Sequence, residues 1–148
     1  MAYSNALSAY RETRIRTASQ GQLIVMLYDE AVKQLDIALE ILVRSEREKT
    51  DPRRIEKINN AVVKAQEIVT ELMASLDFEV GGEIASNLFS LYNWFNRELL
   101  QANIARDEKR IRAVRDMVDE LRTAWHGAVA KSSAEASLKP SGGVNIAG

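Results

Sequence analysis

Residues 24–42 read IVMLYDEAVKQLDIALEIL. Apolar or small side chains recur there at steps of 4, 3, 4, 3 and 4 residues, at Ile24, Tyr28, Ala31, Leu35, Ala38 and Leu42. Such spacing keeps side chains on one face of an α-helix, whereas a strand alternates every second residue. The stretch therefore predicts an amphipathic helix with one buried stripe, and Ser19 followed by Gln22 fits a capping box at its start.

Three further segments carry the same rhythm. The stripe of the second runs through Ile55, Ile58, Val62, Ala65, Val69, Leu72 and Leu76, that of the third through Ile84, Leu88, Leu91, Phe95, Leu99 and Ala102, and that of the fourth through Ile111, Val114, Val118, Leu121, Trp125 and Ala128. Asp51 and Pro52 suit the cap and first turn of the second helix, and Asp107 suits the cap of the fourth. The Gly81-Gly82 pair is expected to separate the second helix from the third.

The lengths of these helices and of their connectors predict the architecture. Each helix has roughly 20–26 residues, or ~30–39 Å. Short connectors make neighbouring helices antiparallel, and the 3/4 alternation suits packing at about +20°. We predict an all-α fold, an antiparallel up-down-up-down four-helix bundle over residues 19–130. Residues 1–18 are expected to form an N-terminal lid segment, and residues 131–148, rich in Ser, Ala and Gly, a flexible tail.

Composition excludes several classes of function. The chain has 148 residues, the size of one domain, and 20 Lys and Arg against 21 Asp and Glu give a net charge of −1. This balance argues against nucleic acid as a partner. The absence of cysteine excludes disulfides, zinc thiolate sites and thiol catalysis. No signal peptide is recognisable, and the longest apolar run, residues 23–28, is too short for membrane insertion. We therefore expect a cytoplasmic protein.

Catalytic and metal-binding signals are weak. A di-iron bundle needs Glu-x-x-His motifs, but the single histidine, His126, follows Thr123 at that spacing. A ferritin-like metal oxidase is therefore an unlikely alternative, and a helix-end position for His126 is expected instead. Gly81-Gly82 is not part of a phosphate loop, because no strand precedes it and no Gly-Lys-Ser/Thr follows. We expect neither an enzyme nor a cofactor.

Apolar residues exceed what one bundle stripe requires. The second helix also carries Val63, Ile68 and Met73, and the third carries Phe89 and Tyr92 on one flank and Trp94 on the other. Residues 65–96 contain five acidic residues and no lysine or arginine. Two interpretations stay open: a broad core covered by the N-terminal segment, or a groove that receives an apolar segment of a partner.

Several stretches, taken in order, resemble the flagellar secretion chaperone family, FliS. They are residues 17–29 (TASQGQLIVMLYD), Lys64-Ala65-Gln66 with Ile68, Glu71-Leu72, Ser75-Leu76-Asp77, Gly81-Gly82-Glu83-Ile84-Ala85 with Asn87-Leu88, Leu91-Tyr92, Leu121-Arg122 with Ala124-Trp125, and the N-terminal Tyr10. Glu30 stands where glycine is common in the family, and Gln20 where proline is frequent. Both residues are compatible with a helix.

The resemblance implies a cytoplasmic antiparallel bundle that binds the disordered C-terminal segment of newly made flagellin. Such a chaperone prevents premature polymerisation and delivers flagellin to the flagellar type III export apparatus and its gate. The candidate partner-binding residues, from the resemblance and from the surplus of apolar side chains, are Leu7 and Tyr10 in the lid, Lys64, Gln66 and Ile68 in the second helix, and Asn87, Phe89, Tyr92 and Trp94 in the third. An alternative is an adaptor for another flagellar assembly or regulatory protein, such as an anti-sigma factor or a co-chaperone.

Overall fold

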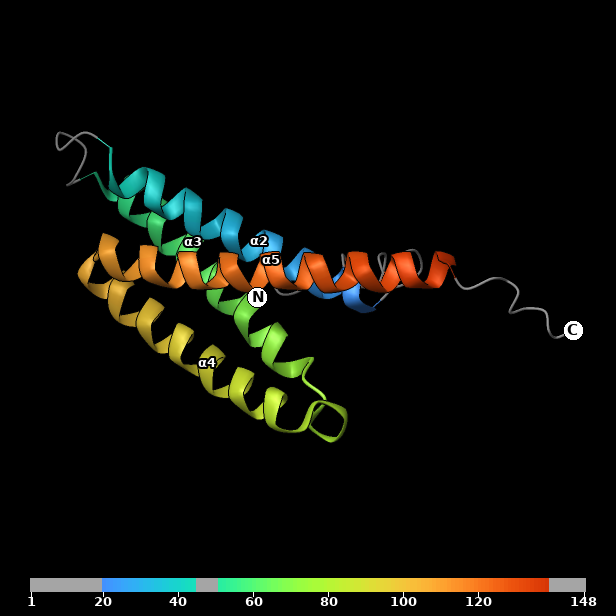
Figure 1. Ribbon diagram of the computed structural model, residues 1–148. Coiled ribbons are helices and arrows are strands. Elements are labelled where there is room, and N and C mark those ends of the chain that lie inside the picture. The colour runs from blue at the N-terminus through green and yellow to red at the C-terminus, as the bar shows by residue number, and fades with distance from the viewer. Residues whose placement is uncertain (1–19, 45–50, 139–148) are drawn as a thin grey trace, which may run out of the picture.

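Four helices account for nearly all of the residues that the computed structural model describes, 20–44 and 51–138. They are α2 (Gln20–Leu42), α3 (Pro52–Ala74), α4 (Phe78–Ala105) and α5 (Glu108–Leu138). Helix α2 packs against α3 and α5, and α4 packs against the same two helices. Successive helices run in opposite directions, with α2 and α4 on one diagonal (Figure 1). The predicted all-α antiparallel bundle is confirmed.

Aspartate caps begin three of the helices. Asp51 Oδ1 accepts a hydrogen bond from the Arg53 amide at 2.9 Å, and Asp107 Oδ1 accepts one from the Arg110 amide at 3.2 Å, as predicted. Asp77 Oδ1 accepts from the amides of Glu79 and Val80, so α4 begins before the glycine pair. Ser19 lies outside the described residues, and its capping box stays a prediction.

The predicted stripes meet in one core. Its largest fully buried side chains come from all four helices: Tyr28, Leu27, Leu35, Ile58, Val62, Ile68, Val69, Leu72, Tyr92, Phe95, Leu99 and Ile111. Every helix contributes buried apolar side chains to this core, so most of its stripe is covered by neighbouring helices.

Three stripe positions prove to be exposed. Ile55 is 37% exposed in the first turn of α3, and Ile84 is 70% exposed near the start of α4. Ala128 of α5 is also exposed. All three lie toward the ends of the bundle, where fewer neighbouring helices cover a side chain. The spacing of apolar residues does not show where a neighbouring helix ends, so it could not predict this exposure.

Helix α5 continues to Leu138, beyond Lys131, where the sequence analysis placed the start of a flexible tail. Residues 128–138 contain neither glycine nor proline and are rich in alanine, the best helix former. The next proline is Pro140. This helix-favouring composition explains why α5 continues beyond the last turn that has an apolar stripe.

The bundle has two layers, α2 with α5 and α3 with α4, and these layers diverge at one end (Figure 1). Figure 1 shows the α3–α4 corner moving away from the N-terminal end of α2 and the C-terminal part of α5. Gly82 lies just after this corner with φ 49° and ψ −122°, a conformation that interrupts the regular helix inside α4. Residues 78–81 therefore form a separate turn ahead of the main α4 rod.

Gly82→Ala should destabilise the protein by about 1–2 kcal/mol, because a Cβ atom disfavours positive φ. Gly127→Ala is the matched control. Gly127 lies within α5 and an added Cβ there meets nothing within 4 Å, so alanine should stabilise the helix by roughly 0.5–1 kcal/mol. Urea unfolding of both variants measures the two effects. Equal effects of the two substitutions would contradict a special conformation at Gly82.

Candidate partner-binding surface

Exposed apolar side chains concentrate on α4. Of the nine large hydrophobic residues that are exposed in the described part of the chain, six belong to this helix: Phe78, Val80, Ile84, Phe89, Leu100 and Ile104. Val80 is 86% exposed and Ile104 71%. The Phe78 and Phe89 rings meet edge to face with centroids 5.9 Å apart. One helix thus carries most of the apolar surface that the bundle leaves uncovered.

The outer part of this set follows helical geometry. At 100° per residue, Phe89, Leu100 and Ile104 fall within about 60° of one another around the α4 axis. Their mean direction lies roughly 125° from that of the buried Phe95 and Leu99 line. The three side chains therefore form a row on the outside of the bundle, distinct from the stripe that fills the core.

A hollow of about 260 Å³ opens where the two layers diverge. Its lining is mostly apolar and comes from the start of α2, the α3–α4 corner, α4 and α5: Gln20, Gly21, Ile24, Ser75, Leu76, Asp77, Val80, Gly81, Ile84, Ala85, Leu88, Tyr92 and Trp125. Val80 and Ile84 are exposed members of this lining, whereas Ile24 and Tyr92 are buried. The hollow is thus continuous with the exposed apolar residues at the start of α4.

A buried pair of tyrosines lies beside the hollow. The Tyr28 and Tyr92 hydroxyls are hydrogen bonded to each other across the α2–α4 diagonal. The Tyr28 ring stacks on Trp125 of α5 with centroids 6.4 Å apart. Burial, followed by the influence of Tyr92, raises the pKa of Tyr28 far above its ordinary value, and burial also raises the pKa of Tyr92. Both phenols are therefore neutral, and one can donate to the other.

Two of the candidate residues belong to the core. Ile68 is fully buried and Tyr92 is 1% exposed, so neither presents an outer surface to a partner. The sequence analysis placed Tyr92 beside Phe89 on a flank of the core stripe. In the structure the Tyr92 hydroxyl is bonded to that of Tyr28 instead. Tyr92 also lines the hollow, so a partner side chain can reach it only by entering the hollow.

The other candidates vary in exposure. Phe89 and Asn87 are exposed, and Lys64 is half-buried. Gln66 is half-buried and its Nε2 donates to the Asn96 carbonyl at 3.2 Å, which ties α3 to α4. Trp94 packs against the core with its ring 5.9 Å from that of Phe95. Leu7 and Tyr10 lie outside the described residues.

The sequence analysis missed several exposed residues of α4. Leu100 and Ile104 lie one helical turn apart, outside the assigned stripe, and this spacing could have identified them as a second row. No spacing pattern pointed to Phe78 and Val80. The glycine pair was expected to separate the second helix from the third, whereas α4 begins before this pair, at Phe78.

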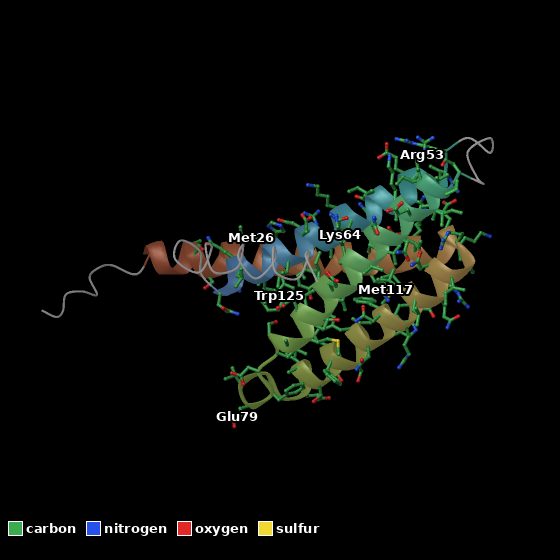
Figure 2. All side chains as sticks on the ribbon, turned by 180° about the vertical axis from the view of Figure 1, so that it is seen from behind. Met26, Arg53, Lys64, Glu79, Met117 and Trp125 are labelled. Carbon is green, nitrogen blue, oxygen red and sulfur yellow. The ribbon has the colours of Figure 1, made fainter. Side chains whose placement is uncertain are left out.

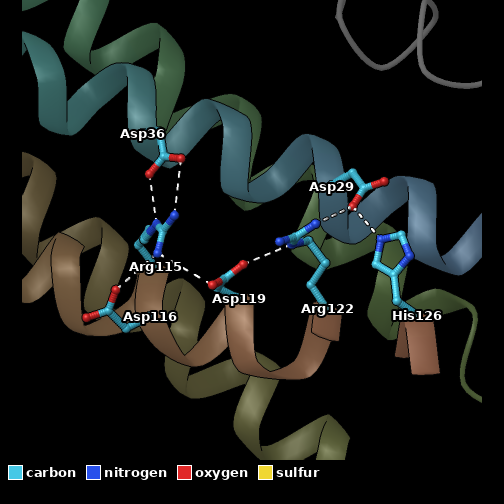
Figure 3. Close-up of polar contacts among 7 residues, drawn as sticks. All are labelled: Asp29, Asp36, Arg115, Asp116, Asp119, Arg122 and His126. Carbon is cyan, nitrogen blue, oxygen red and sulfur yellow. Dashed lines mark hydrogen bonds and ion pairs between the residues drawn. The ribbon is translucent and has the colours of Figure 1, made fainter. Parts of the chain in front are cut away.

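The α2–α5 face is polar, and its charges pair with one another (Figure 3). Arg115 Nε lies 2.8 Å from Asp36, while Arg122 lies 2.9 Å from Asp119 and 3.2 Å from Asp29. These hydrogen bonds raise the pKa of both arginines, chiefly through Asp36 for Arg115 and through Asp119 for Arg122. The surface hollow of about 530 Å³ on this face is therefore lined by side chains that largely neutralise one another.

His126 takes part in this paired face and is not a helix-end residue as expected. Its Nε2 lies 3.0 Å from Asp29 Oδ1, and α5 continues for twelve residues beyond it. Across the ranges that the structure describes, no group of three or more His, Cys, Asp or Glu residues is arranged to hold a metal ion. None of the described helices is long and apolar enough to cross a membrane.

Tyr28→Phe and Tyr92→Phe should each destabilise the protein by about 1–3 kcal/mol, because each leaves a buried hydroxyl without its partner. The double variant should lose less than the sum, since it removes both hydroxyls. Urea unfolding of the four proteins measures this coupling. Strictly additive losses would show that the two hydroxyls do not interact.

Comparison with known proteins identifies the family of this chain. The family model described as flagellar protein FliS matches residues 3–132. The flagellar secretion chaperone FliS of Bacillus subtilis is 30% identical over 129 residues, covering 87% of this chain and 90% of that protein. Its counterpart in Salmonella typhimurium is 36% identical over 127 residues, covering 85% and 88%. The chain therefore belongs to the FliS family of flagellar secretion chaperones.

Proposed function

We propose that this protein binds the disordered C-terminal segment of flagellin in the cytoplasm. Binding keeps flagellin from polymerising prematurely and delivers it to the flagellar type III export apparatus. The protein acts by covering apolar surface and not by catalysis. Its relatives in Bacillus subtilis and Salmonella typhimurium carry the name flagellar secretion chaperone, which supports a flagellar export role.

The observation that carries the proposal is the exposed apolar surface of α4 with the adjoining hollow. A segment that folds on binding loses conformational entropy, so it needs several apolar anchors spread over a long surface. After Gly82, α4 offers four such side chains, Ile84, Phe89, Leu100 and Ile104, over roughly 30 Å at 1.5 Å per residue, and Phe78 and Val80 add two in the turn before it. The α2–α5 face does not offer this, because its hollow is lined by mutually paired charges.

Deletion of the flagellin C-terminus tests this function. Isothermal titration with full-length flagellin should show binding with a negative heat-capacity change, because apolar surface is buried. Flagellin that lacks its last ~40 residues, a segment longer than the α4 surface when extended, should not bind. Undiminished binding of the truncated flagellin would contradict the proposal.

Substitutions on α4 test where flagellin binds. Ile84→Ser and Ile104→Ser should each weaken binding by more than about 1 kcal/mol, the threshold that separates important interface residues from neutral ones. Stability should change little, since both side chains are exposed. Val43→Ser is the control, because Val43 is 57% exposed just after α2, away from this surface. Equal affinity of all three variants would place the binding surface elsewhere.

A further inference from the structure

The exposed apolar surface of α4 carries unlike charge at its two ends. Glu79 and Glu83 directly precede the exposed Val80 and Ile84, whereas Arg97 lies one turn before Leu100. Figure 2 shows Glu79 at the α3–α4 corner, far along the molecule from Arg53 at the opposite end of α3. A segment that lies along α4 therefore meets negative charge near the hollow and positive charge toward Leu100.

The glutamates at this corner differ from the charges of the α2–α5 face. Glu79 and Glu83 are exposed, and no basic residue in the described part of the chain pairs with either. No lysine or arginine occurs anywhere from residue 65 to residue 96. By contrast, Arg115 and Arg122 are already bonded to aspartates. Within residues 20–44 and 51–138, these two carboxylates are thus not neutralised by an ion pair.

The third capping carboxylate fixes the geometry of the corner. Asp77 accepts hydrogen bonds from the amides of Glu79 and Val80 at 3.0 and 3.1 Å, which holds the 78–81 turn against the hollow. A partner side chain that covers Val80 or Ile84 must come close to Glu79 or Glu83, because each glutamate directly precedes one of these residues. Covering these carboxylates with a neutral or acidic segment would remove water from them without compensation.

From this juxtaposition we infer that the bound segment carries lysine or arginine beside the apolar positions that enter the hollow, and that this charge orients the segment along α4. The inference rests on the proposed function, since it specifies the chemistry and direction of the flagellin segment. Charges at the rim of an interface act mainly on the rate of association and on its salt dependence, while the apolar anchors determine dissociation.

Charge reversal at the corner tests the inference. Association of purified flagellin with the full-length protein should slow at least about fivefold between about 50 mM and 500 mM NaCl, because salt screens exposed charges. Glu79→Lys combined with Glu83→Lys should reduce the association rate at low salt about tenfold, leave dissociation nearly unchanged and reverse the salt effect, because salt then screens a repulsion. Surface plasmon resonance measures both rates.

The matched control is Glu56→Lys combined with Glu120→Lys. These glutamates are exposed on α3 and α5, and their reversal changes the net charge by the same amount away from the corner. It should leave the association rate within about twofold, since a uniform change of net charge has a weaker effect than a local one. Circular dichroism establishes that both double variants are folded.

The outcomes separate the two proposals. If flagellin binds the wild-type protein but salt and both double variants leave its association rate unchanged, the charge inference is overturned and the proposed function stands. Failure of flagellin to bind the wild-type protein would overturn both. If sedimentation instead shows that the corner reversal dissociates a dimer of the wild-type protein, the occupant of the corner is a second copy of this chain and the inference is overturned.

Discussion

The contact between Tyr28 and Tyr92 joins α2 and α4 across the diagonal of the bundle, beside the hollow. Trp125 stacks on one side of this pair and Phe95 lies on the other, with its ring centroid 6.3 Å from that of Tyr92. Large aromatic side chains thus fill the core up to the point where the layers diverge. Because one hydroxyl donates to the other, each of these buried oxygens has a hydrogen-bond partner inside the protein.

The rest of the surface is organised around this boundary. On the α2–α5 side, arginines and aspartates bond to one another and leave little charge for an external partner. On the α4 side, six large apolar side chains are exposed, and within residues 20–44 and 51–138 no basic side chain pairs with the corner glutamates. Exposed ion pairs contribute only about 0.2–1 kcal/mol each, so this segregation concerns recognition more than stability.

Periodicity was sufficient to predict the four helices, their antiparallel order and most of the core, because burial of one stripe per helix follows directly from spacing. It placed Ile84 in the core wrongly, because this residue lies near the start of α4, where fewer neighbouring helices cover a side chain and spacing alone gives no sign of it. The sequence analysis also grouped Tyr92 with Phe89 on one flank. At 100° per residue, however, Tyr92 lies about 20° from the buried Leu99 and Phe89 about 80° from it, so a closer angular count separates the two.

The break at Gly82 separates two parts of α4 that differ in their packing. Residues after it belong to a continuous rod whose buried side chains pack against α3 and α5, so exchange of those side chains disturbs the core. The short turn before it, residues 78–81, is joined to that rod through one flexible backbone position and supplies Val80 to the edge of the hollow. Substitutions in this turn can therefore reshape the rim of the hollow while the core of the rod behind it keeps its packing.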